Sequence, residues 1–354
     1  MAPALRSFLK PFTDLQPTTR ARIGQVIGAV VGLLFLVLAV RLLQHELSPE
    51  VRQRIPAALA SLAWWQIGGA VVLSVIVHCW LGLFDHLALR TIGITNVPVM
   101  VAMRTGFIAY SFVHNIGLSA LTGNVIRMKR YAAHQVRPAS VVKIFVCLIF
   151  TMWIGWTVAF GASIVVWPTG LLPMGIGVER AVGVAMLVVV VAYLAVCRFG
   201  PARFRGDDAP LKLPSGHHAV LQVAMGTVNW MATALVLWLV LPASAAYHEV
   251  LAALCMVQVV VIASHVPGGV GVLEGTLLVL LGDRVDPAGL AAGVVLFRAI
   301  YFLLPFALSL VLLLAEQIFK RLRPATVEHD RHNEAGRQGE IRPTPPTSLV
   351  PSAS

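Results

Sequence analysis

The sequence predicts an all-α, polytopic integral membrane protein with about six full crossings and two re-entrant hairpins. Hydrophobic residues make up 58% of the 354 residues and charged residues only 12%, whereas soluble domains average roughly 45–50% and about 25%. Strand-like alternation is absent, so the backbone must satisfy its polar groups within helices. The apolar runs that approach the ~20 residues of a bilayer span are 23–44, 64–84, 141–167, 181–199, 219–241 and 288–315.

Two further apolar regions, 97–124 and 249–282, are expected to enter and leave the membrane on one side. A full crossing by 97–124 would put the basic loop that follows it outside, against the positive-inside rule. The second region breaks at Pro267, and the remaining segment 270–282 would form a helix of about 20 Å. That length is too short for a hydrocarbon core of about 30 Å.

The positions of the basic residues predict that both termini are cytoplasmic. Of the 27 Lys and Arg residues, 20 fall inside in this topology. The four outside are Arg52, Arg54, Arg180 and Arg284, and the three embedded in apolar runs are Arg41, Arg104 and Arg298. We therefore expect a basic cytoplasmic segment at 1–22, a membrane domain at 23–320 and a disordered cytoplasmic tail at 321–354, which is rich in proline and charge.

The predicted topology contains an internal symmetry. Each half runs crossing, crossing, hairpin, crossing, and the second half begins on the opposite face. Many secondary transporters use such an inverted repeat to build alternating access around a site near the bilayer midplane. The sequence HNIG at 114–117 weakly resembles HVPG at 265–268, so the topology carries this argument more than the residues do.

The segment 264–274, SHVPGGVGVLE, is the sharpest motif. Pro267 lacks an amide donor and should end the preceding helix, and Gly268 and Gly269 permit positive φ at the turn. A helix that restarts near Val270 would place Glu274 in its first turn, where the helix dipole favours an acid. A capping role is the structural alternative, but acids inside the membrane are costly and usually functional.

The segment 117–127, GLSALTGNVIR, marks the return of the first hairpin. Asn124 interrupts the apolar pattern, and Arg127 could hold a phosphate with two hydrogen bonds. Alternatively, Arg127 snorkels to anionic head groups. We also expect Asp85, Arg104 and Arg298 to be buried charges, either in ion pairs or, with His78, in a proton relay.

Signatures of catalysis or of metal and cofactor binding are missing, so we expect no enzyme, no cofactor and no metal. The sequence has no G-x-S-x-G, H-E-x-x-H or Walker pattern, and its four cysteines stand singly. The net charge of +11 is explained by cationic loops, so we expect no nucleic acid partner. The expected partners are membrane lipids, with a homo-oligomer or envelope-biogenesis proteins as further possibilities.

With these motifs, the region from about 60 to 320 resembles the membrane domain of the lysylphosphatidylglycerol synthase family, especially its stand-alone YbhN-like branch. The resemblance rests on 117–127, 264–274 and the sequence RAIY at 298–301 followed by Pro305; Leu273 stands where phenylalanine is expected. In full-length relatives this domain flips an aminoacylated phospholipid that a separate soluble domain makes. The resemblance therefore implies lipid translocation or binding, and we expect the synthase domain to be absent.

We accordingly expect a lipid translocase of the bacterial inner membrane, with its site between the hairpin tips. The alternative is an accessory protein that supports lipid or envelope glycan synthesis without moving lipid. The expected substrate-binding residues are Glu274, Arg127, His265, Gly268, Gly269, Asn124 and Arg298.

Overall fold

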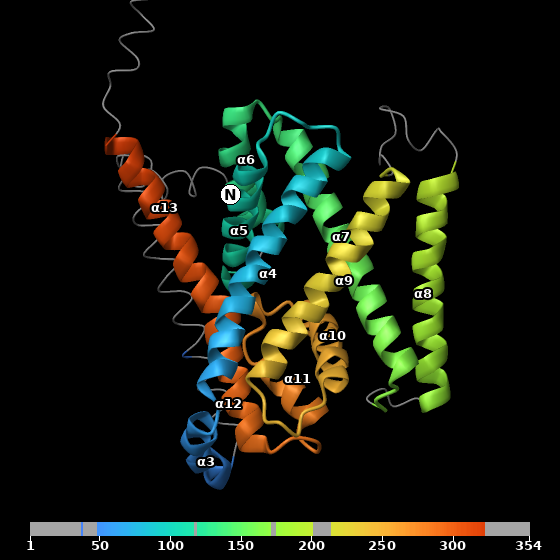
Figure 1. Ribbon diagram of the computed structural model, residues 1–354, viewed down its shortest axis with the longest axis vertical. Coiled ribbons are helices and arrows are strands. Elements are labelled where there is room, and N and C mark those ends of the chain that lie inside the picture. Colours follow the sequence, from blue (N-terminus) through green and yellow to red (C-terminus); the bar gives the residue numbers. More distant parts are fainter. Residues whose placement is uncertain (1–36, 38–47, 117–118, 171–174, 201–213, 323–354) are drawn as a thin grey trace, which may run out of the picture. The chain divides into compact units, whose positions relative to one another are not determined.

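The computed structural model describes residues 37, 48–116, 119–170, 175–200 and 214–322. Every regular element among them is helical, and they contain no strand (Figure 1), so the predicted polytopic all-α fold is confirmed. The basic segment 1–22, nearly all of the expected crossing 23–44 and the tail from 323 lie outside the described residues. The chain divides into two units, Met1–Ser309 and Leu310–Ser354, and the sites below lie in the first.

Six described helices are long and apolar enough to cross a membrane, but they are not quite the expected six. Five match the predicted crossings, and the sixth, Tyr247–Ser264, was expected to be an arm of the second hairpin. Its 18 residues rise about 27 Å, so length alone cannot separate a hairpin arm from a span. The spans are α4 (Trp64–Thr91), α7 (Pro138–Val166), α8 (Ile176–Phe199), α9 (Gly216–Leu239), α10 (Tyr247–Ser264) and Pro287–Phe319.

The last of these spans contains three segments. Helix α12 (Pro287–Phe297) is followed by a π-helical segment, η4 (Arg298–Leu303), and then by α13 (Leu304–Leu322). A short helix, α3 (Pro49–Ala60), precedes α4. It begins at Ser48, whose hydroxyl accepts a hydrogen bond from the amide of Val51, as N-cap residues do.

Helices α5 (Val99–Ile116) and α6 (Ser119–Tyr131) form the first hairpin. The Arg130 guanidinium donates to the hydroxyl of Thr105, and Gly123 packs beside Val113. The start of one helix thus meets the end of the other, so they are antiparallel. Asn96, before α5, donates to the carbonyl of His134, after α6, so the chain leaves the hairpin where it entered.

The second hairpin consists of α10, the short 3₁₀ turn η3 (Pro267–Gly269) and α11 (Val272–Leu281). Arg284 contacts Glu249 across its open end at 2.5 Å. At the tip, α10 ends at Ser264, His265 is left-handed, and Gly268 and Gly269 have φ of 65° and 58°. The predicted break at this motif is confirmed, and the helix restarts at 272 instead of near Val270.

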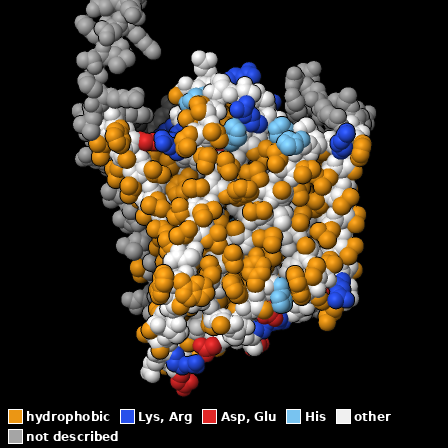
Figure 2. Space-filling view, viewed as in Figure 1, with side chains coloured by type: hydrophobic (Ala, Val, Ile, Leu, Met, Phe, Trp, Pro, Cys, Tyr) orange, Lys and Arg blue, Asp and Glu red, His pale blue; other side chains and the backbone are white. Residues whose placement is uncertain are grey.

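The two hairpins open toward opposite ends of the helical unit (Figure 1). Hydrophobic side chains cover the middle of the face drawn in Figure 2, and charged side chains gather at its two ends. Helices α4, α6 and α8 end where the first hairpin opens (Figure 1), and the last turns of these helices carry Arg90, Lys129, Arg130 and Arg198. Helix α3, which contains Arg54, and the start of α8, which contains Arg180, lie at the other end. The grouping matches the predicted inverted arrangement, and the cytoplasmic side remains a prediction.

Glycines allow the closest helix contacts. Gly155 of α7 lies against the backbone of Gly226 of α9 with no room for a Cβ, and Gly82 of α4 is equally close to Met103 of α5. Small residues at such crossings let backbones approach and gain dispersion contacts, which matters in lipid, where hydrophobic burial between helices is weak. These contacts set the frame in which the hairpins are held.

Candidate functional site

The second hairpin tip is held by a buried ion pair. The Nε atom of Arg298 lies 2.5 Å from Oε1 of Glu274, and the two side chains are 5% and 3% exposed. Oε2 of Glu274 accepts the amide of Gly271 at 2.8 Å. Glu274 therefore lies in the first turn of α11 as predicted, and its basic partner is Arg298.

The same arginine also binds the backbone of the turn. Its other two guanidinium nitrogens donate to the carbonyls of Gly268 and Gly269 at 3.2 and 3.4 Å. A turn in this conformation leaves its carbonyls without helical partners, and buried carbonyls need a donor. Arg298 thus couples the position of the π-helical segment to the conformation of the hairpin tip.

A second buried ion pair fixes the first hairpin. Nε and Nη2 of Arg127, on α6, donate to the two carboxylate oxygens of Asp85, on α4, at 2.7 and 2.9 Å. The hydroxyl of Tyr131 donates to the same carboxylate at 2.8 Å. Arg127 is only 3% exposed, so the snorkelling interpretation of this residue is wrong.

The two pairs mirror each other with the charges exchanged. At the first hairpin, α6 supplies the arginine, Arg127, and the spanning helix α4 supplies the acid. At the second hairpin, α11 supplies the acid, Glu274, and the last spanning segment supplies the arginine. Breaking a buried pair by removing one partner typically costs roughly 3–5 kcal/mol, because a charge is left without compensation. Both pairs are therefore strong constraints on how each hairpin sits.

Aromatic rings connect the two pairs. The guanidinium of Arg127 lies 5.3 Å from the ring centre of Tyr110, and that of Arg298 lies 5.2 Å from the ring centre of Phe302. Between them, the ring of His114 is 6.1 Å from Tyr110 and 5.9 Å from Phe302. The first hairpin thus meets the π-helical segment through a continuous row of rings.

The ring of His78 joins this row, 5.6 Å from that of His114. Three buried polar atoms on these side chains lack a hydrogen-bond partner among the described residues: Nε2 of His78, the hydroxyl of Tyr110 and Nδ1 of His114. His78 is fully buried, and its Nδ1 lies 2.9 Å from the carbonyl of Ser74. Because that carbonyl can only accept, Nδ1 carries the proton, and Nε2 of the neutral ring is a bare acceptor. Buried polar groups are normally satisfied, so the cluster calls for an explanation.

The π-helical segment was missed by the sequence reasoning. The wide turn of this segment leaves backbone carbonyls free to accept hydrogen bonds from side chains of other helices. The Ser74 hydroxyl donates to the carbonyl of Ile300 at 2.8 Å, and the Asn115 side-chain amide donates to the carbonyl of Phe302 at 2.9 Å. Such segments often occur at functional sites. The signal that could have found it is the pair of polar side chains, Ser74 and Asn115, within otherwise apolar runs.

The expected site residues separate into two groups. Glu274, Arg298, Gly268 and Gly269 come together at the second tip, whereas Arg127 belongs to the other pair. Asn124 is buried on α6, three residues before Arg127, and the exposed His265 ring lies 2.9 Å from the carbonyl of Ala263.

Among the three expected buried charges, Asp85 and Arg298 are buried as predicted. The prediction that Arg104 is buried is wrong, since it lies on the exposed side of α5. Packing against neighbouring helices decides which face of a helix is buried. Among the described residues, no group of three or more His, Cys, Asp and Glu side chains could hold a metal ion.

Fold and site together define a polytopic helical membrane protein built around two opposed, ion-paired hairpins. The sequence is 30% identical over 267 residues to inner membrane protein YbhN of Escherichia coli (strain K12), an alignment that covers 72% of this chain and 80% of the relative. The chain belongs to the YbhN family. Together with the six long apolar helices, this membership supports a multi-pass protein of the inner membrane.

A second relative, the uncharacterized protein slr0712 of Synechocystis, is 24% identical over 329 residues, which cover 91% of this chain and 100% of the relative. No family model matches the sequence. The relatives support the YbhN-like branch, and the wider resemblance to lysylphosphatidylglycerol synthases rests on the motifs alone.

Proposed function

We propose that the protein moves a phospholipid or related lipid between the leaflets of the inner membrane. The observation that carries the proposal is that two hairpins, open to opposite ends, meet around two buried ion pairs. Helix α5 of the first hairpin contacts both η3 and η4, so the first hairpin lies beside the tip of the second and the π-helical segment. Sites of this design serve transporters that expose one central site alternately to the two sides.

The chemistry of the site suits a lipid phosphate. Arg127 and Arg298 present guanidinium groups, which match the geometry of phosphate as well as that of carboxylate. Each is neutralised by one acid, Asp85 or Glu274. A phosphate that replaced either acid would keep the arginine satisfied, and the displaced acid would then need a proton or a cationic part of the lipid.

The second tip has the features of a moving part. Positive φ at Gly268, Gly269 and Gly271 gives the turn conformations that other residues rarely adopt. Because Arg298 holds both Glu274 and the turn carbonyls, displacing it would release the tip in one step. Loops of this kind gate many binding sites.

The test is lipid movement by the purified protein in vesicles. Fluorescent phospholipids with zwitterionic and anionic head groups are placed in both leaflets, and the fraction accessible to an external quencher is followed with time. Wild-type protein should raise that fraction beyond one leaflet. No movement of any lipid would favour the accessory role in lipid or envelope glycan synthesis.

The Glu274→Gln variant leaves the Arg298 guanidinium buried without its acid, so we expect a loss of stability of roughly 3–5 kcal/mol. Lipid movement per inserted molecule should also fall on the order of tenfold through loss of one charge-assisted contact. Glu50→Gln, at an exposed position of α3, is the matched control and should behave like wild type. A purely structural role of Glu274 would also lower abundance in Glu274→Gln but would leave lipid movement per molecule normal.

A further inference from the structure

We propose that a separate lipid-docking site lies beneath helix α3, where Arg54 takes the phosphate of an anionic phospholipid in exchange for Asp286. The site deepens the proposed function by giving the lipid a docking position at one end of the helical unit. Its role in transport rests on that function, whereas the binding itself is tested without transport.

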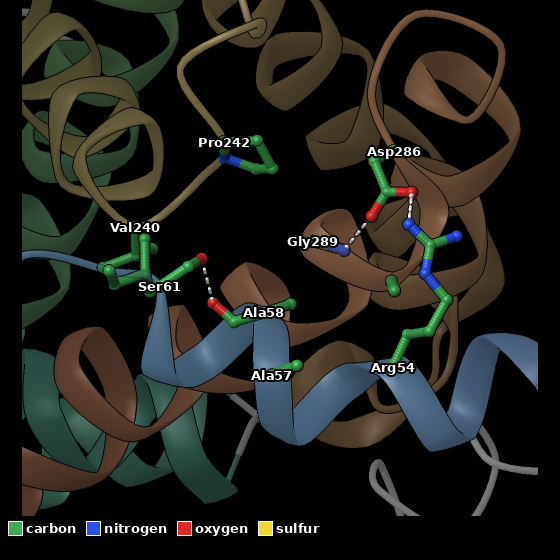
Figure 3. Close-up of a pocket in the computed structure, with 10 residues that line it drawn as sticks. Arg54, Ala57, Ala58, Ser61, Val240, Pro242, Asp286 and Gly289 are labelled. Atoms are coloured by element: carbon green, nitrogen blue, oxygen red, sulfur yellow. Dashed lines mark hydrogen bonds and ion pairs between the residues drawn. The ribbon is translucent and has the colours of Figure 1, made fainter.

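The site is a cavity of about 300 Å³ between α3, the turn after α9 and the start of α12 (Figure 3). Ala57 and Ala58 of α3 line it with small side chains, and Val240 and Pro242 line it from the turn after α9. Gly289 of α12 completes the lining, in close contact with Pro242. The volume is at the lower end of the ~300–1,000 Å³ usual for ligand sites. The lining is mostly apolar, as the upper part of an acyl chain requires.

The polar groups of the cavity are arranged around an anion. The carboxylate of Asp286 accepts from Arg54 at 2.8 Å and from the amide of Gly289 at 2.9 Å (Figure 3). A phosphate oxygen in the same place would meet the same arginine and the same helix N-terminus. Asp286 thus occupies the position that a lipid phosphate would take.

The Arg54–Asp286 pair is open to exchange. The two side chains are 63% and 39% exposed, and ion pairs with this exposure contribute little to stability because water competes for both charges. This distinguishes the pair from Asp85–Arg127 and Glu274–Arg298, which are almost fully buried. Replacing Asp286 by a lipid phosphate at Arg54 therefore costs little.

The depth of the cavity points to a lipid as the occupant. Trp64 and Trp65 follow directly after the cavity wall and are 85% and 56% exposed. Exposed tryptophans at the end of a spanning helix mark the head-group level of the bilayer. Helix α3 has no buried residue of its own and rests on α12 through Val51 and Ile55, so it lies at the same level.

The two partners of the ion pair should give opposite results. Arg54→Gln removes the cation and should lower binding of phosphatidylglycerol about fivefold or more, as loss of a charge-assisted contact implies. Asp286→Asn keeps the helix cap, because asparagine caps as well as aspartate, but frees Arg54. This variant should therefore raise binding of the same lipid.

The experiment measures lipids bound to the purified full chain by native mass spectrometry, with phosphatidylglycerol as the probe and phosphatidylcholine for comparison. Arg52→Gln is the matched control, since it makes the same charge change on the same helix outside the cavity, and it should leave binding unchanged. Ala58→Leu fills the cavity without changing charge and should lower binding.

Equal losses in Arg52→Gln and Arg54→Gln would mean general attraction of anionic lipid and would overturn the site. Unchanged or weaker binding in Asp286→Asn would make the pair merely structural, with the same consequence. Lipid movement measured on the wild-type protein separates the two proposals. If the variants bind lipid as predicted but the wild-type protein moves no lipid, the docking site is supported and the transport function is contradicted.

Discussion

The two hairpins are built on one plan but are held in different ways. Among the described residues, the hydrogen bonds of the Arg127 guanidinium go to the carboxylate of Asp85, so this pair attaches α6 to α4. Arg298 binds Glu274 and also two carbonyls of the glycine turn. The Asp85–Arg127 pair is therefore chiefly an anchor of its hairpin, whereas the Glu274–Arg298 pair controls the conformation of the hairpin tip.

The largest expected effect concerns the sides from which the hairpins open. Single cysteines at Arg137 and Asp207 should react with a membrane-impermeant maleimide only from the cytoplasm, and one at Asp283 only from outside, in a background without the four native cysteines. Position 207 lies outside the described residues. Glu179, a natural choice for a second outer label, is fully buried and binds Thr169 and Gly170, so the exposed Arg180 replaces it.

Labelling of position 137 from outside in intact cells would contradict the first hairpin, because the segment before it would then be a full crossing. Labelling from the cytoplasm at 137 and from outside at 180 and 283 would support cytoplasmic termini and opposed hairpins together.

Next in size is removal of the anchoring arginine. Arg127→Gln leaves the Asp85 carboxylate buried without a cation, and we expect a loss of roughly 3–5 kcal/mol, measured as lower abundance and lower thermal stability in detergent. Adding Asp85→Asn should restore much of that loss. Arg104→Gln is the control, since Arg104 is exposed and should change stability by no more than about 0.5 kcal/mol.

A failure of the double variant to recover would show that the bidentate geometry, and not charge compensation, holds α6 in place. Equal losses in Arg104→Gln and Arg127→Gln would contradict the anchoring role.

A smaller loss of stability, with a large loss of lipid movement, is expected at the second tip. Replacing Pro267 and Gly268 by leucine forces a side chain onto a position with φ of 65°, which costs about 1–3 kcal/mol. It also moves the carbonyl that Arg298 binds. Gly275→Ala on α11 is the control, because an added Cβ there meets nothing within 4 Å. Wild-type movement and topology in the double variant would make the break incidental.

The smallest change in stability is expected in the row of rings between the pairs. His78→Leu removes a buried acceptor that has no partner among the described residues, so the free energy of unfolding should fall by no more than about 1 kcal/mol. Lipid movement should still decrease, because the buried polar atoms of His78, Tyr110 and His114 then lose one member. A large loss of stability with normal activity per molecule would assign His78 to packing.

Local features of the sequence were enough to predict the class of fold and the break in the second hairpin. Long apolar runs admit only helices in a bilayer, and Pro267 with Gly268 and Gly269 cannot continue one. The sequence also identified Glu274 as a first-turn acid, because that position follows from local spacing alone.

Which charged residues form ion pairs could not be predicted from the sequence, because the partners come from distant segments. Arg104 and Arg298 both stand in apolar runs, yet one is exposed and the other buried, because hydropathy does not say which way a helix faces. Asp85 and Arg127 are 42 residues apart, and nothing local relates them. The π-helical segment exists because Ser74 and Asn115, from other helices, satisfy the carbonyls that its wide turn leaves open. Ion pairs and helix contacts of this kind depend on packing between segments that are distant in the sequence. The candidate site consists of residues from such segments.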